Sequence, residues 1–76
     1  MPRGVFNWTF KDVTNFLRDH NFEITHVEES HYFYRGFTGG APRIVQVPFH
    51  GAKSLKPRTL QSIIRQSGID KKKWLA

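Results

Sequence analysis

The 76-residue sequence has no cysteine, few acidic residues and no long hydrophobic run. Without cysteine, neither a disulfide framework nor a thiolate zinc site is available, although small domains often depend on such cross-links. No stretch approaches the roughly 20 apolar residues of a membrane span, and the first residues lack the apolar core of a signal peptide. These absences predict a cytoplasmic protein that does not bind membranes and is stabilised by its hydrophobic core alone.

Length and composition limit the fold. A 60-residue domain buries only about 60% of the surface that its unfolded chain exposes, so this chain has room for one layer of helices on one sheet. Rossmann folds, barrels and multidomain enzymes are excluded. Hydrophobic residues make up 38% of the sequence, which is too many for a disordered tail of this charge. With no proline- or serine-rich linker and no internal repeat, we expect one domain over residues 1–76.

Basic residues outnumber acidic residues by 12 to 6, and they are unevenly placed. Residues 1–30 hold three basic and five acidic side chains, a balance of −2, whereas residues 31–76 hold nine and one, a balance of +8. A compact fold of such a chain has a polarised electrostatic field. We therefore expect a polyanion, and nucleic acid above all, as the ligand.

The hydrophobic pattern predicts elements in the order α-β-β-β-α. Thr9 and Asp12 resemble a capping box, and apolar residues at helical spacing follow to about residue 19. Asn21 suits the left-handed conformation that ends a helix. Alternating or aromatic-rich residues at 22–27 and 31–37, and β-branched residues at 43–47, are typical of strands.

The links between these stretches fix the fold class. The turns at 28–30 and 38–42 are short, so the three strands form an antiparallel meander. Pro57 suits the first position of a second helix, and Gly68 with Ile69 is typical of a Schellman ending. Asp70 then caps a short last helix. We predict an α+β fold: a three-stranded antiparallel sheet with both main helices on one face.

The order of elements, the Ser-His pair at 30–31 and the stretch 45–69 together resemble the HicA toxins of bacterial toxin–antitoxin systems. The stretch runs from Val-Gln-Val-Pro-Phe-His-Gly to Ser-Gly-Ile, and the resemblance covers about residues 8–75. It implies a fold like that of double-stranded-RNA-binding domains. It also implies an endoribonuclease that cleaves messenger RNA and is neutralised by an acidic HicB-like antitoxin.

The family's catalytic histidine lies in a Gly-Ser-His stretch, which falls on Glu29-Ser30-His31. Ser30 and His31 match, whereas Glu29 replaces a glycine and implies a different turn. Cleavage of RNA without a metal requires a base, an acid and cations that stabilise the developing charge. Histidine serves as base or acid near neutral pH. The resemblance thus implies that His31 is the general acid or base, with no metal and no small-molecule cofactor.

By analogy with the family, Tyr32 and Tyr34 face the helices, so that His31, Phe33 and Arg35 share the open face. A flat ring and a guanidinium on one exposed strand suit a splayed RNA strand. The start of the second helix adds cations, and helix N-termini also favour phosphate. The predicted RNA-binding residues are Ser30, Phe33, Arg35, Lys53, Lys56 and Arg58, and the lysines at 71–73 add nonspecific attraction.

The other histidines are weaker candidates. His26 has the parity of Phe22 and Ile24, which places it at the core edge of a strand. His50 lies in a turn, where it is structural or assists a phosphate. No two histidines have metal-ligand spacing on one element, so we expect no metal site.

Two alternatives from other classes remain. A noncatalytic RNA- or DNA-binding module would keep the fold and charge without cutting, and Glu29 is the residue that favours it. A protein-interaction domain would use the aromatic strand to dock a partner. Cleaved RNA ends produced by the purified protein would argue against the first, and binding to nucleic acid at low salt would argue against the second.

Overall fold

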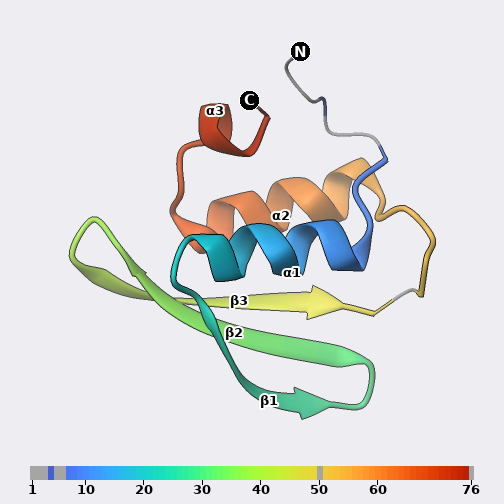
Figure 1. Ribbon diagram of the computed structural model, residues 1–76, viewed down its shortest axis with the longest axis horizontal. Coiled ribbons are helices and arrows are strands. Elements are labelled where there is room, and N and C mark those ends of the chain that lie inside the picture. The colour runs from blue at the N-terminus through green and yellow to red at the C-terminus, as the bar shows by residue number, and fades with distance from the viewer. Residues whose placement is uncertain (1–3, 5–6, 50, 76) are drawn as a thin grey trace.

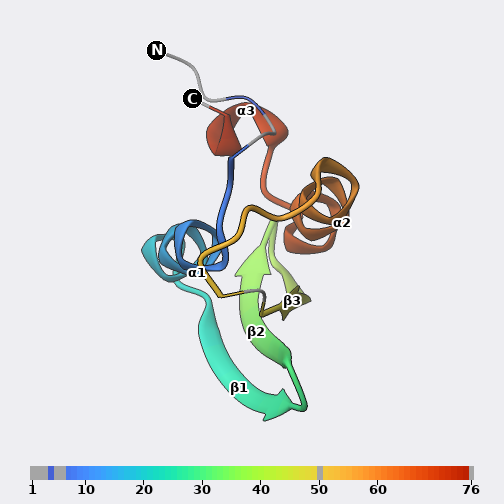
Figure 2. The same cartoon turned by 90° about the vertical axis from the view of Figure 1, so that its right-hand side faces the viewer.

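The computed structural model describes residues 4, 7–49 and 51–75, and its elements follow the predicted order. They are α1 (Phe10–Asp19), β1 (Glu23–Glu28), β2 (His31–Thr38), β3 (Ala41–Pro48), α2 (Pro57–Ser67) and α3 (Lys71–Trp74). The strands form one antiparallel sheet in the order β1-β2-β3. Figures 1 and 2 show α1 and α2 on one face of this sheet, and no described element covers the other face. The predicted α+β class is confirmed.

Helix α1 begins at the predicted capping box. The Thr9 hydroxyl oxygen accepts from the Asp12 amide at 3.2 Å, and the Asp12 carboxylate accepts from the Thr9 amide at 3.0 Å. The helix ends before Asn21, whose φ of 66° is the left-handed conformation expected there. Val13 and Leu17 are fully buried, so this face of α1 packs on the sheet.

The core lies between the two long helices and the sheet. Its fully buried aliphatic members are Val13 and Leu17 of α1, Val45 and Val47 of β3, and Leu60 and Ile63 of α2. Trp74 of α3 closes one end of this core, because its ring stacks on Phe16 with centroids 3.9 Å apart and contacts Trp8 at 5.6 Å. The short last helix is therefore part of the packed structure.

One buried hydroxyl joins α2 to α3. Ser67 donates to the Ile64 carbonyl at 2.7 Å and accepts from the Ile69 amide at 3.1 Å and from Trp74 Nε1 at 3.3 Å. Gly68 is left-handed, with φ 70°, as a Schellman ending requires. The Ile69 amide, however, bonds the Ser67 side chain rather than the helix carbonyl that a Schellman motif uses, so the predicted motif is only partly formed.

Turns set the length of β2 and β3. Gly39 and Gly40, with φ 62° and 78°, make a two-residue turn between Thr38 and Ala41. The strands therefore pair up to the turn, and β3 is longer than the predicted 43–47. Its prolines at 42 and 48 are tolerated because β3 is an edge strand.

Strand β1 extends away from the helices (Figure 2), and all six of its residues are exposed. It is anchored at its start by Phe22, which is 1% exposed and packs on Gly36 of β2. A Cβ added to Gly36 would lie 2.6 Å from the Phe22 ring, so only glycine fits there. Further along, a β-bulge between Ile24 and His26 interrupts the pairing of β1 with β2.

Candidate nucleic-acid interface

The side chains of β2 alternate as predicted. Tyr34 is 5% exposed and faces the helices, and Tyr32 packs against the same core. His31, Phe33 and Arg35 therefore point to the open face. Their partners across β3 are Pro48, Gln46 and Ile44.

His31 lines a cavity of about 230 Å³ where the open face meets α2. The lining residues are His31, Gln46, Pro48, Thr59, Ser62, Ile63 and Gln66. The Gln46 amide, at the free edge of β3, donates to the Gln66 side-chain oxygen at 2.9 Å. This bond holds α2 beside the edge strand, so hydroxyl and amide groups of the helix lie around the same space as the imidazole.

A second cavity, of about 320 Å³, lies at the start of α2 and is lined by Lys53, Ser54, Lys56 and Thr59. Thr59 lines both cavities. The two predicted lysines are therefore neighbours of the His31 cavity, although they lie at least 22 positions after the histidine in the sequence. Arg58 is exposed in the first turn of α2, outside both linings.

The open face carries a stacked ring pair beside His31. The rings of Phe33 and His26 have centroids 4.3 Å apart and an interplanar angle of 7°. His26 is exposed and pairs with Phe33 across the strands. The prediction that His26 lies at the core edge is therefore wrong, because the bulge after Ile24 adds a residue and reverses the alternation.

The sequence did contain a signal for this bulge. Ile24 pairs with Tyr34 and Val27 pairs with Tyr32, so both apolar residues lie on the helix side of the sheet. They are three positions apart, whereas a regular strand places residues of one face two or four positions apart.

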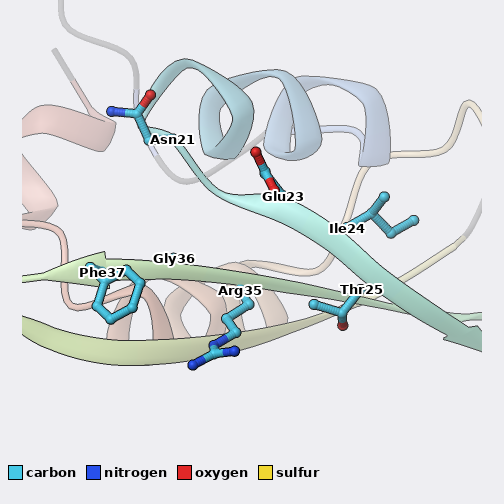
Figure 3. A pocket seen from close by; sticks show the side chains of 7 residues that line it. All are labelled: Asn21, Glu23, Ile24, Thr25, Arg35, Gly36 and Phe37. Atoms are coloured by element: carbon cyan, nitrogen blue, oxygen red, sulfur yellow. The ribbon is translucent and has the colours of Figure 1, made fainter.

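Arg35 lies away from His31, towards the other end of β2. Four residues of strand separate the two, which corresponds to about 13 Å. The Arg35 guanidinium carbon lies 5.8 Å from the centre of the Phe37 ring, which is 66% exposed. Both side chains line a third cavity, of about 430 Å³, together with residues of β1 and the turn before it (Figure 3). Arg35 and His31 thus belong to different parts of one face.

The turn before His31 keeps the conformation that a glycine would give. Glu29 has φ 54°, in the left-handed region. The expectation of a different turn is therefore wrong, and a non-glycine residue adopts the strained conformation instead. Ser30 is exposed, and its carbonyl accepts from the Phe49 amide at 2.8 Å, which ties the turn to the segment after β3. His50 lies outside the described residues.

Within residues 4, 7–49 and 51–75, no three side chains of histidine, aspartate or glutamate are grouped so that they could hold a metal ion. In the same part of the chain, no helix has the length and apolar character needed to cross a membrane.

These features define a small α+β domain with a histidine cavity that adjoins a lysine cavity. The chain matches, over residues 10–69, the family model described as the HicA toxin of bacterial toxin–antitoxin. It therefore belongs to the HicA toxin family, as the sequence predicted. Membership gives it the toxin part of a toxin–antitoxin system, with an antitoxin as partner. Comparisons with curated proteins and with solved structures gave no match.

Proposed function

We propose that this toxin is a metal-independent endoribonuclease that cleaves messenger RNA, with His31 as a general acid or base. One observation carries the proposal: Thr59 joins the cavity of His31 to the cavity of Lys53 and Lys56. A phosphate held by either lysine would lie in the cavity next to that of the imidazole. Cations placed there would stabilise the negative charge that develops on the phosphoryl group during cleavage.

The rest of the open face suits an unpaired RNA strand. Phe33 and His26 offer a flat stacked surface beside His31, and Phe37 and Arg35 offer a second one further along β2. Bases stack on aromatic rings and on guanidinium groups with little dependence on sequence. In this proposal Ser30 and Arg58 make peripheral contacts with the RNA backbone.

The basic half of the chain also suits the second partner. We propose an acidic, HicB-like antitoxin that covers the His31 cavity, and a cytoplasmic site of action where messenger RNA is available. The noncatalytic alternative was favoured by Glu29. Glu29 adopts the left-handed conformation, so the turn before His31 is not altered. The turn therefore gives no support to the noncatalytic alternative.

Two lysine pairs with equal charge test the proposed RNA path. Lys53→Ala/Lys56→Ala removes both cations of the cavity next to His31, whereas Lys72→Ala/Lys73→Ala removes two exposed cations of α3. On a single strand, each phosphate contact that is lost lowers the salt slope of binding by about 0.7. We expect the first pair to lower the slope by about 1.4 and to slow RNA cleavage. The second pair should lower the slope less and slow cleavage less. Equal effects of the two pairs would contradict this path.

A further inference from the structure

The bulge in β1 places a second histidine next to His31. His26 pairs with Phe33, and His31 is two residues before Phe33 on the same face of β2. Such diagonal neighbours on adjacent strands are about 7–8 Å apart. Aromatic side chains at this spacing are within reach of each other, so one phosphodiester can lie between the two rings.

The Thr25 hydroxyl contacts both His26 and the backbone of β2. The Thr25 hydroxyl lies 3.2 Å from the Phe33 carbonyl, to which it donates, and 3.2 Å from His26 Nδ1. A hydroxyl has a single hydrogen. When that hydrogen is donated to the Phe33 carbonyl, the hydroxyl oxygen can accept from the Nδ1–H of His26, and a neutral His26 then has a free lone pair on Nε2.

The ring of His26 is also held in one plane and remains accessible. It stacks on Phe33 at 4.3 Å with nearly parallel planes, and His26 is exposed to solvent. A fixed imidazole with an accessible, unprotonated Nε2 has the properties of a general base. The bulge thus turns His26 to the open face, and the Thr25 hydroxyl lies where it can accept from Nδ1.

We propose that His26 is the general base of RNA cleavage and that His31 is the general acid. This inference rests on the proposed ribonuclease function and assigns its two proton transfers. His26 Nε2 takes the proton of the ribose 2′-hydroxyl, and the 2′-oxygen forms a bond to phosphorus. The bond from phosphorus to the 5′-oxygen breaks, and that oxygen takes a proton from the His31 imidazolium. The products are a 2′,3′-cyclic phosphate and a 5′-hydroxyl, and solvent restores both histidines.

Two substitutions separate catalysis from stacking. His26→Phe keeps a flat ring against Phe33, whereas His26→Ala removes the ring. A general base contributes about 10²- to 10⁴-fold to the rate, so we expect His26→Phe to lose that factor while its RNA affinity stays unchanged. His26→Ala should lose the same factor and also bind RNA more weakly. Wild-type cleavage by His26→Phe would overturn the inference.

An RNA with sulfur in place of the bridging 5′-oxygen distinguishes the two roles, because a thiolate leaves without needing a proton. We expect this substrate to restore cleavage by His31→Ala but not by His26→Phe. If this substrate restored cleavage by His26→Phe, the assignment of His26 as the general base would be overturned. If His31→Ala cleaves ordinary RNA as fast as the wild type, the proposed function itself fails, whereas activity of His26→Phe alone refutes only this inference.

Thr25 is a positioning residue in this scheme. Thr25→Val has the same shape but cannot accept the bond from His26 Nδ1, and Thr25→Ser can. We expect a loss of cleavage rate in Thr25→Val, with unchanged RNA affinity, and recovery in Thr25→Ser. Equal rates for the two variants would contradict the assigned tautomer.

Discussion

Ser67 provides a stringent test of the packing between α2 and α3. Its side chain is fully buried, and the hydroxyl accepts from the Ile69 amide and from Trp74 Nε1. Ser67→Ala leaves both donors without this acceptor in the core, where Ile69 is 8% and Trp74 1% exposed. The bond from Thr38 to the Ser67 carbonyl uses the backbone and survives the substitution.

The expected loss of stability follows from the two donors, the Ile69 amide and Trp74 Nε1. An unsatisfied buried donor costs about 1–3 kcal/mol, and the indole bond, at 3.3 Å, is the weaker of the two. Alanine recovers about 0.5 kcal/mol of helix propensity. The net loss is about 2–4 kcal/mol, out of the roughly 4–11 kcal/mol expected for a domain of this length. Such a loss lowers the melting temperature by about 10–25 °C.

Urea unfolding followed by circular dichroism measures this loss. Ser62→Ala is the matched control, because it is the same substitution on the same helix at a half-buried position. A change outside the core should stay within about 0.5 kcal/mol. If Ser67→Ala is as stable as Ser62→Ala, the Ser67 hydroxyl does not stabilise the packing of α3 on α2.

Two further substitutions test the glycine and the turn that shape β2. Gly36→Ala forces a Cβ against the Phe22 ring, so we expect a loss of about 1–3 kcal/mol, measured by thermal unfolding; an unchanged melting temperature would contradict the contact. Glu29→Gly relieves about 1–2 kcal/mol of left-handed strain, partly offset by a gain in unfolded-state entropy. The melting temperature of the variant should therefore be equal to that of the wild type or higher. Its RNA affinity should be higher, because an anion near His31 is lost. Weaker RNA binding by the variant in a titration would contradict this expected effect of the charge.

Local sequence signals were sufficient for most of the fold. Three of these signals affect only the residues next to them in the sequence. They are the capping box at Thr9 and Asp12, the glycine pair of the hairpin, and Pro57 at the start of α2. Each therefore favours the same local conformation that the folded chain adopts. The alternation along β2 could be predicted for the same reason, since its period is set by the strand itself.

The site could be predicted only in part, because its geometry depends on contacts between distant segments. His31 reaches Thr59 only through the docking of α2 on the edge of β3, which the bond between Gln46 and Gln66 secures. The position of His26 depends on pairing between β1 and β2, because only pairing turns the three-residue spacing of Ile24 and Val27 into a bulge. A single sequence shows neither contact directly.

Replacement of His31 tests whether its imidazole is required for RNA cleavage. His31→Ala should be expressed in cells without antitoxin and also purified, with its fold checked by circular dichroism. We expect that the variant still binds RNA, leaves messenger RNA intact and no longer arrests growth, whereas the wild type cleaves RNA and arrests growth. Undiminished cleavage and growth arrest by His31→Ala would contradict it.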